Sequence, residues 1–309
     1  MMNVVDIFCG CGGLSLGFQE AGFNIVRAFD NWSKAIDIYN LNFNHEAELI
    51  DAYELTAEYI SKFSPDIIIG GPPCQDYSSA GKQDETQGRA NLTLRYAQIV
   101  CEVNSEWFVM ENVDRILKSK TLPKAISLFK EAGYGLSQAV LDASLCGVPQ
   151  KRKRFFLIGH KNDMDDFLTA RLYSDLSAKS TTIRDDLGDE LETDFYYRHP
   201  RSYARRGIFS IDEPSPTVRG VNRPIPPGYI IHSNDATDDI SKVRPLTTLE
   251  RARIQTFPKS FQFSGSKTDL EQMIGNAVPV DLAKYVAKHL LEYTQNPSNV
   301  QVQLQFNMA

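Results

Sequence analysis

Short apolar runs alternate with stretches of helical periodicity along the first half of the chain. The runs are rich in β-branched and aromatic residues and lie at 3–8, 23–30, 65–71, 107–113, 135–143 and 154–160. Apolar positions recur with the period of a helix at 14–22, 33–43, 95–103 and 122–133. Strands that alternate with helices favour a largely parallel sheet covered on both faces. We therefore predict an α/β fold with a ligand site at the carboxyl ends of the strands.

This alternation stops in the region 183–244, which is rich in Arg, Pro, Gly and Tyr. Two amphipathic helices are predicted after it, at 247–257 and 281–293. One apolar face of the second helix is formed by Leu282, Tyr285, Val286 and Leu290. We expect this helix to pack back on the first part of the chain.

The change in pattern predicts two domains and a tail. One domain comprises 1–182 together with 268–295, and a smaller, irregular domain comprises 183–267. In the tail, 296–309, apolar and polar residues alternate strictly from Val300 to Phe306, which is typical of a half-exposed strand. The tail either pairs with a sheet edge or another subunit, or is disordered.

The composition is that of a globular protein, and 309 residues are enough to bury a substantial core. The first residues have no basic flank and no small-residue cleavage site, and no apolar run is long enough to span a bilayer. We therefore expect a cytoplasmic protein without membrane contact. The five cysteines are odd in number and contain no CxxC pair, so neither a disulfide framework nor a metal site is favoured.

The net charge of −6 hides an asymmetry between the two halves of the chain. Residues 1–150 carry 11 Lys and Arg against 19 Asp and Glu, a net charge of −8, whereas the remainder carries 22 against 20, a net charge of +2. The positive charge is clustered in QKRKR, 150–154, and in RHPRSYARRG, 198–207. Such clusters either bind a polyanion or form a solvated face.

Four chemically distinctive features follow predicted strands and should line one rim of the sheet. They are the glycine-rich FCGCGG at 8–13, Asp30, Cys74 and Glu111. A glycine-rich turn lets a ligand approach the backbone and the helix amino terminus, and a carboxylate at the end of the next strand can accept from ribose hydroxyls. The turn departs from GxGxxG, so a nucleoside cofactor without a pyrophosphate fits better than a dinucleotide, although the turn alone could be purely structural.

Cys74 stands in GGPPCQDYSSAGK, 70–82, where Pro72 and Pro73 fix the entering backbone. A rigidly held thiol at the edge of a polar loop is the placement that a nucleophile needs, whereas a buried cysteine is usually a core residue. Glu111 on a neighbouring strand is a candidate partner, since burial can make a carboxylic acid useful near neutral pH.

Six blocks together resemble the DNA (cytosine-5)-methyltransferases of prokaryotic restriction-modification systems. The blocks are DIFCGCGGLSLGF, GGPPCQDYSSAGK, MENV, QKRKR, RPLTTLERARIQTFP and IGNAVP. They run in the order and approximate spacing of that family from about Val4 to His289. The resemblance implies a Rossmann-like sheet that binds S-adenosyl-L-methionine, with a catalytic domain, a target recognition domain at 183–267, and methylation of C5 of a flipped-out cytosine.

In this family a cysteine, here Cys74, attacks C6 of cytosine, because C5 alone is a poor nucleophile. The resemblance implies that Glu111 holds a proton at N3 and that Asn112 braces its loop. It implies that Arg154 contacts the cytosine O2 and that Arg152 supports the loop and nearby phosphates. The product of the cofactor would be S-adenosyl-L-homocysteine.

The resemblance also implies a set of cofactor contacts. They are Phe8, Gly10, Cys11, Gly12, Gly13, Asp30, Asn31, Asp51, Pro72, Asn276 and Val278. Within this set Asp30 would bind the ribose and Asp51 the adenine amino group. Many members have an aromatic residue directly after the ribose acid, whereas here Asn31 follows Asp30 and Trp32 comes one position later.

A third set is expected to contact duplex DNA. It comprises Gln75, Ser78, Lys82, Arg205, Arg206, Thr217, Arg219, Asn222 and Arg223. Thr217 in PTVRG matches a turn that positions the backbone of the flipped nucleotide, and Arg219, Asn222 and Arg223 are candidates for base contacts.

The expected partner is therefore double-stranded DNA, bound by a monomer associated with the nucleoid and paired functionally with a restriction endonuclease. Two alternatives stay open. The transfer-RNA branch of the family shares the catalytic blocks, and a catalytically silent homologue would bind DNA without transferring a methyl group.

Overall fold

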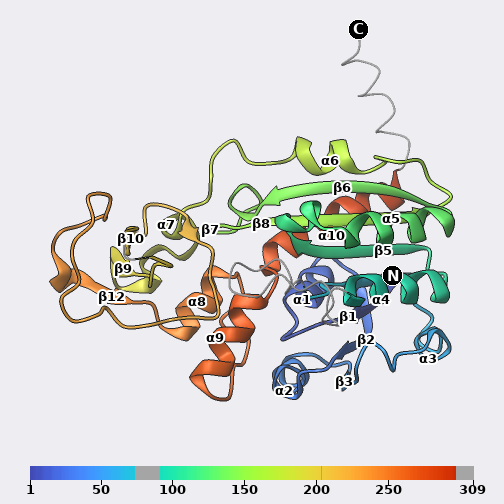
Figure 1. Cartoon of the computed structure of the whole chain (residues 1–309), viewed down its shortest axis with the longest axis horizontal. Coiled ribbons are helices and arrows are strands. Elements are labelled where there is room, and N and C mark those ends of the chain that lie inside the picture. Colours follow the sequence, from blue (N-terminus) through green and yellow to red (C-terminus); the bar gives the residue numbers. More distant parts are fainter. Residues whose placement is uncertain (74–90, 203, 297–309) are drawn as a thin grey trace, which may run out of the picture. The chain divides into compact units, whose positions relative to one another are not determined.

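The computed structural model describes residues 1–73, 91–202 and 204–296, shown as a ribbon in Figure 1. The chain divides into two compact units. The first unit comprises Met1–Leu141, Lys153–Leu176 and Ala283–Ala309, and the second comprises Asp142–Arg152 and Ser177–Leu282. The alternating segment of the tail lies outside the described residues.

The first unit is built on a seven-stranded sheet (Figure 1). Its order is β3 (Ala47–Leu49), β2 (Asn24–Asp30), β1 (Asn3–Ile7), β4 (Ile67–Gly70), β5 (Trp107–Val113), β8 (Lys153–Lys161) and β6 (Tyr134–Asp142). Strands β3, β2, β1, β4 and β5 pair in parallel, whereas β8 pairs antiparallel with β5. The predicted α/β fold is confirmed, and the sheet is mixed.

The helices predicted for the first unit are present, and α3 and α6 were not predicted. They are α1 (Gly13–Glu20), α2 (Ser33–Asn42), α3 (Ala57–Ser61), α4 (Asn91–Val103), α5 (Thr121–Glu131), α6 (Thr169–Ser174) and most of α10 (Val280–Gln295). Helices α4 and α5 lie side by side and bury their apolar faces in one core with the strands (Figure 1). All of β4 is buried, as a strand covered on both faces must be.

The predicted apolar face of α10 is largely confirmed. Leu282, Val286 and Leu290 are fully buried. Tyr285 is half-buried instead, and its hydroxyl donates a hydrogen bond to the Leu172 carbonyl in α6. Lys284 pairs with Glu20 at the end of α1, so the helix packs on the first unit as expected.

The second unit contains a three-stranded sheet in the order β10 (Ile208–Ser210), β9 (Phe195–Tyr197) and β12 (Val243–Pro245). Its helices are α7 (Ile183–Leu187), α8 (Thr248–Ile254) and α9 (Lys267–Asn276). Helix α8 begins with a capping box, in which Thr247 and Glu250 each bond the other's backbone N–H. A small core of Tyr197, Ile208 and Val243 holds the sheet together.

The bounds of the second unit differ from those of the domain expected at 183–267. The unit also takes in Asp142–Arg152, because β7 (Gln150–Lys151) pairs with β11 (Ser215–Pro216). It takes in α9 because Gly275 lies directly against the backbone of Gly220, where an added Cβ would come within 2.4 Å of the Gly220 nitrogen.

Replacing Gly159 with alanine should lower the free energy of unfolding by about 1–3 kcal/mol. Gly159 on β8 faces Phe108 on β5, and an added Cβ would lie 2.0 Å from the Phe108 ring. That ring cannot move aside freely, because it stacks on Phe129 with the ring centres 3.9 Å apart. Urea unfolding measures the effect. Gln138→Ala, at an exposed position of β6, is the control, and equal loss in both variants would contradict the packing described.

Candidate active site

The glycine-rich turn after β1 is bonded to the neighbouring strand. Phe8 adopts a left-handed conformation with φ of 70°, and the backbone N–H groups of Phe8 and Cys9 both donate to the Phe29 carbonyl. Gly12 has φ of 99°, and an added Cβ there would lie 2.4 Å from the Phe43 ring. At Gly10 the space beside the backbone is open to 4 Å. The turn therefore leaves room for a ligand where α1 begins.

The carboxylate of Asp30 is held at the edge of this turn. Its Oδ2 accepts from the Gly10 N–H at 2.8 Å, and its Oδ1 accepts from the Trp32 N–H at 2.9 Å. Burial raises the pKa of Asp30, and these backbone donors oppose the rise. Each oxygen keeps a further lone pair, as a ribose hydroxyl would require.

Asp51 lies beside the same strand end. The Ile50 N–H donates to the Asp30 carbonyl, and the Asn31 side-chain amide lies 3.3 Å from the Asp51 Oδ2. Three of the predicted cofactor residues, Asp30, Asn31 and Asp51, are thus brought together with the glycine-rich turn. This donor and acceptor set fits a nucleoside and offers no lysine for a pyrophosphate.

A chain of hydrogen bonds runs beneath the turn. Ser15 donates to Asp6 at 2.6 Å, the Tyr39 hydroxyl donates to Ser15 at 2.7 Å, and His45 Nε2 lies 2.7 Å from that hydroxyl. Asp6 is fully buried, and its Oδ1 has no hydrogen-bond partner among the described residues. Burial raises the pKa of Asp6 to about 7, the bond from Ser15 opposes this rise, and Asp30 adds to it.

Glu111 and Arg154 meet across the antiparallel pair of β5 and β8. Val113 lies opposite Arg154 in the register, and Arg154 Nε lies 2.8 Å from Glu111 Oε1. Burial lowers the pKa of Arg154, and the charge of Glu111 opposes this. Both side chains are nearly buried, so the pair is a strong local field at the end of β5.

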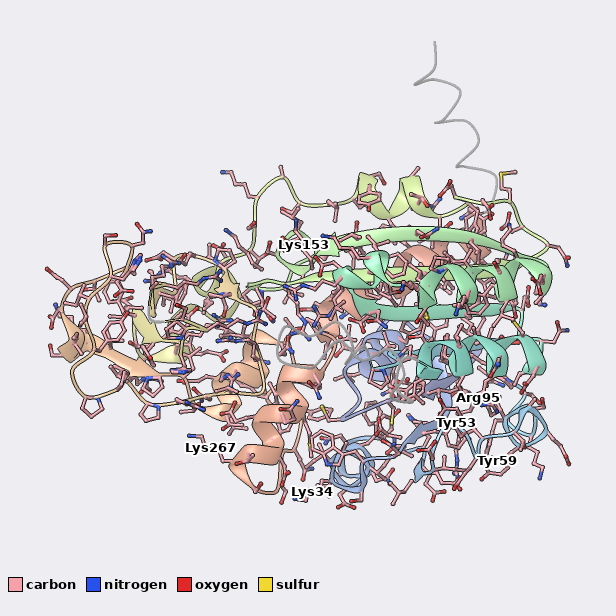
Figure 2. The ribbon with its side chains drawn as sticks, viewed as in Figure 1. Lys34, Tyr53, Tyr59, Arg95, Lys153 and Lys267 are labelled. Atoms are coloured by element: carbon pink, nitrogen blue, oxygen red, sulfur yellow. The ribbon has the colours of Figure 1, made fainter. Side chains whose placement is uncertain are left out.

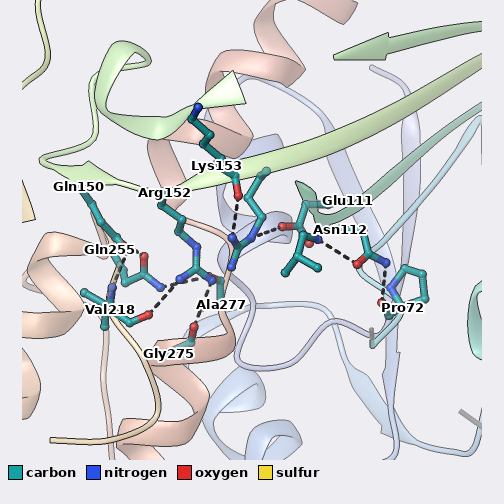
Figure 3. Close-up of polar contacts among 12 residues, drawn as sticks. Pro72, Glu111, Asn112, Gln150, Arg152, Lys153, Val218, Gln255, Gly275 and Ala277 are labelled. Atoms are coloured by element: carbon teal, nitrogen blue, oxygen red, sulfur yellow. Dashed lines mark hydrogen bonds and ion pairs between the residues drawn. The ribbon is translucent and has the colours of Figure 1, made fainter. Parts of the chain in front are cut away.

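Asn112 ties this pair to the end of the segment that precedes Cys74. Its side-chain amide donates to the Pro72 carbonyl at 3.0 Å, and its Oδ1 accepts from the Val113 N–H (Figure 3). Gly71 lies against the Glu111 carboxylate, since an added Cβ would come within 3.2 Å of Oε2. Asn112 thus joins β5 to the segment before Cys74, and its expected bracing role stays a prediction.

Arg152 has a different environment from Arg154. It is 1% exposed, and its guanidinium donates to the carbonyls of Val218, Gly275 and Ala277 in the second unit (Figure 3). These contacts hold the Arg152 side chain inside the second unit, and its expected support of the loop and of nearby phosphates stays a prediction.

Gln150 and Gln255 extend this buried network. Gln150 donates to the side-chain oxygen of Gln255 at 2.6 Å and accepts from the Val218 N–H at 2.8 Å. Sequence reasoning missed both glutamines, because their contact joins positions 105 residues apart and leaves no local pattern.

A basic cavity of about 520 Å³ lies in the second unit. Its basic lining residues are Lys151, Arg198, Arg201, Arg205, Arg206 and Arg219. Arg205 and Arg206 were predicted to contact DNA, whereas Lys151, Arg198 and Arg201 were missed as individual residues although both charge clusters contain them. Lys151 and Arg205 are exposed, as groups that meet a polyanion should be.

Several of the residues expected to contact DNA bond to the protein itself. Arg206 pairs with Glu213, with its guanidinium 4.1 Å above the Phe209 ring. Arg219 donates to the His199 carbonyl at 2.5 Å, while Asn222 donates to the Leu246 carbonyl at 2.8 Å.

Thr217 also makes an internal bond, donating from its hydroxyl to the Lys151 carbonyl at 2.9 Å. Arg223 is exposed. Asn276 and Val278 belong to the second unit, so their expected part in the cofactor pocket of the first stays a prediction. Cys74, Gln75, Ser78 and Lys82 lie outside the described residues.

Within the described ranges, no helix has the length and apolar character needed to cross a membrane.

Residues 2–292 match the family model of the C-5 cytosine-specific DNA methylases. The chain belongs to this family. It is 60% identical over 299 residues to the Type II methyltransferase M.HindV of Haemophilus influenzae, covering 96% of this chain and 98% of that protein. It is 54% identical to M.HgiDI of Herpetosiphon aurantiacus, covering 98% of each.

The solved structure of S. pombe Dnmt2 methyltransferase has the same fold as this methylase. Its TM-score is 0.69 at 20% sequence identity, and the match covers 95% of this chain and 99% of that one. The predicted family, the α/β methyltransferase fold and an enzyme with DNA (cytosine-5)-methyltransferase activity are thereby confirmed.

Removing the donors of Arg152 should destabilise the methylase. In Arg152→Met three carbonyls lose a charged donor, so the free energy of unfolding should fall by more than about 3 kcal/mol. Urea unfolding followed by circular dichroism measures this. Lys151→Met, at the exposed neighbouring position, should change it by less than about 0.5 kcal/mol. Equal midpoints for the two variants would refute the supporting role of Arg152.

Burial of Asp6 should make stability depend on pH. With a folded-state pKa of about 7, against about 4 for an ordinary aspartate, the folded protein holds a proton that the unfolded chain releases. The free energy of unfolding therefore falls as the pH rises from about 4 to about 7, and this contribution is level above that window. Asp6→Asn removes the titrating group.

The stability of Asp6→Asn relative to the original protein should consequently rise by ~2–3 kcal/mol between about pH 5 and about pH 8. Asp37→Asn, at an exposed position of α2, is the control and should give the same difference at both pH values. A constant difference for Asp6→Asn would show that Asp6 does not titrate in this range.

Proposed function

We propose that this methylase transfers a methyl group from S-adenosyl-L-methionine to C5 of a cytosine flipped out of a short duplex DNA site. The single observation that supports this most is the Glu111–Arg154 pair, held by β5 and β8 and tied through Asn112 to the Pro72 carbonyl just before Cys74. A carboxylate, a guanidinium and a thiol in adjoining segments are the groups that activation of a cytosine ring requires.

The Cys74 thiolate would form a bond to C6 of the cytosine. The π electrons of the C5=C6 double bond shift through C5 and C4 toward N3, where Glu111 donates a proton, so that the ring becomes an enamine with a nucleophilic C5. Arg154, beside Glu111, would bind the O2 of the same ring. After C5 has taken the methyl group, a base removes the C5 proton. The electrons of that C–H bond re-form the C5=C6 double bond and expel the Cys74 thiolate, and the N3 proton returns to Glu111.

S-adenosyl-L-methionine, when bound, would supply an electrophilic methyl group and leave as S-adenosyl-L-homocysteine. The open space at Gly10, together with the carboxylates of Asp30 and Asp51, supports a nucleoside at the end of β1 and β2. Asp30 would accept from the ribose hydroxyls, and Asp51 from the adenine amino group. Phe8, whose backbone is bonded to β2, would pack against the same molecule.

The second unit would bind the DNA. The exposed side chains of Lys151, Arg205 and Arg223 suit phosphates or bases, because they already face solvent. Arg219 and Asn222 would shape the recognition loop from within, since their side chains already bond to neighbouring carbonyls. Thr217 would fix the turn through its bond to Lys151.

The names of the relatives, which are Type II methyltransferases, support a proposal for the biological setting. We infer that the protein acts as a monomer on DNA in the cytoplasm, associated with the nucleoid. We further infer that it protects sites that a restriction endonuclease would otherwise cut.

The purified protein, incubated with unmethylated genomic DNA and S-adenosyl-L-methionine, should methylate cytosine at one short motif that bisulfite sequencing identifies. Cys74→Ser should lower the rate by more than about 10³-fold while DNA binding in a gel-shift assay is retained. Cys101→Ser, on α4 and half-buried, is the matched control and should methylate normally.

Methylation by Cys74→Ser at the original rate would refute the nucleophilic role of Cys74. No methylated cytosine in any context, combined with methylation of transfer RNA by the same preparation, would replace the proposed substrate. If the protein methylated neither DNA nor transfer RNA but still bound duplex DNA, it would be a catalytically silent homologue.

A further inference from the structure

The loop 51–55, between β3 and α3, presents one of the proposed cofactor residues. Asp51 begins a tight turn, in which its carbonyl accepts from the N–H groups of Glu54 and Leu55. Its carboxylate Oδ1 also accepts from the Tyr53 N–H at 2.9 Å. Ala52 and Leu55 are buried, whereas Tyr53 is exposed. The loop thus has a buried base at Ala52 and Leu55, an exposed Tyr53 and a half-buried Asp51.

Arg95 on α4 holds this base. Its Nε donates to the Ala52 carbonyl at 3.1 Å, and its Nη2 donates to the Leu55 carbonyl at 2.6 Å. The side chain is only 15% exposed, and its Nη1 lies 3.4 Å from Glu102 on the same helix. Figure 2 labels Arg95 next to Tyr53 of the loop. One planar, rigid guanidinium therefore bonds both ends of the turn.

A loop held in this way is ordered before any ligand arrives. Without the guanidinium, two partly buried carbonyls would lose their donor, and the loop would find other conformations in which water satisfies them. A ligand that needs one conformation then binds more weakly, in proportion to the fraction of molecules that have it. Loss of the Arg95 contacts should therefore weaken the binding of a ligand at Asp51.

We propose that Arg95 is a positioning residue that fixes the loop 51–55 in the conformation in which Asp51 receives the cofactor. Arg95 acts through the loop and not by touching the cofactor. The inference rests on the proposed use of S-adenosyl-L-methionine. It connects helix α4 to the affinity for the cofactor. The family resemblance that assigned Asp51 to the adenine assigns no cofactor role to any residue of α4.

Calorimetric titration with S-adenosyl-L-homocysteine tests the proposal without requiring turnover. Arg95→Met keeps the bulk of the stem but has no donor, and its Kd should rise about tenfold. Arg95→Lys, which can reach one carbonyl, should show a smaller rise. The KM for S-adenosyl-L-methionine should rise in parallel, whereas kcat at saturating cofactor and the Kd for DNA should stay within about twofold.

Glu102→Gln is the matched control, because it removes the charge partner of Arg95 and leaves both bonds to the loop in place. Its Kd should equal that of the original protein. Hydrogen exchange of the amides at 52–56 should speed up in Arg95→Met and Arg95→Lys without ligand, and not in Glu102→Gln.

Unchanged affinity in a folded Arg95→Met protein would overturn the inference and leave the proposed function standing. If Arg95→Met does not fold, unchanged affinity and unchanged exchange in Arg95→Lys would overturn it. If the original protein does not bind S-adenosyl-L-homocysteine, the proposed cofactor use fails, and the inference fails with it.

Discussion

The antiparallel pairing of β8 with β5 is the constraint on which the candidate site depends. The strands from β3 to β5 in the sheet are parallel to one another. Strand β8 runs in the opposite direction along β5 and brings Arg154 opposite Val113. Because side chains alternate between the faces of a strand, this register puts Glu111 and Arg154 on the same face, where they meet. A slip of one residue would turn Arg154 to the other face and leave a nearly buried carboxylate without its cation.

The charges of the site are held by backbone groups as well as by each other. Asp30 accepts from two main-chain N–H groups, and Asn112 bonds the Pro72 carbonyl. Main-chain partners move little when side chains change rotamer, so the carboxylate and the amide stay aimed before any substrate arrives. The first unit therefore combines a rigid rim with one buried group, Asp6, whose protonation changes near neutral pH.

Much of the first unit could be predicted from the sequence because its signals are local. The apolar runs gave the strands, and the glycines of 8–13 and the acid Asp30 marked the rim where the structure has them. The roles of Arg152 and Arg154 could not be separated in this way. They are two residues apart in one basic cluster, yet one binds carbonyls of the second unit and the other binds Glu111.

Local sequence signals also fail to predict contacts between positions that lie far apart in the chain. The bonds of Arg95 to loop 51–55 span about forty residues, and the internal bond of Asn222 reaches Leu246. Tertiary packing decides whether an arginine in a polar segment faces solvent or bonds to a carbonyl. Composition does not show which of the two occurs. Arg219 and Arg205 both stand in polar, arginine-rich segments, yet Arg219 bonds to the His199 carbonyl and Arg205 is exposed.

One feature of the second unit bears on how such an enzyme could be given a new target. Tyr229 and Asp235 anchor the loop at 224–236, through a hydroxyl–carboxylate bond of 2.7 Å and bonds to the backbone of Gly207. Between them Ile230 is 87% exposed. A loop with fixed ends and a free apex can change its outward side chains at little cost in stability. Directed evolution could therefore vary the apex and keep the two anchors constant.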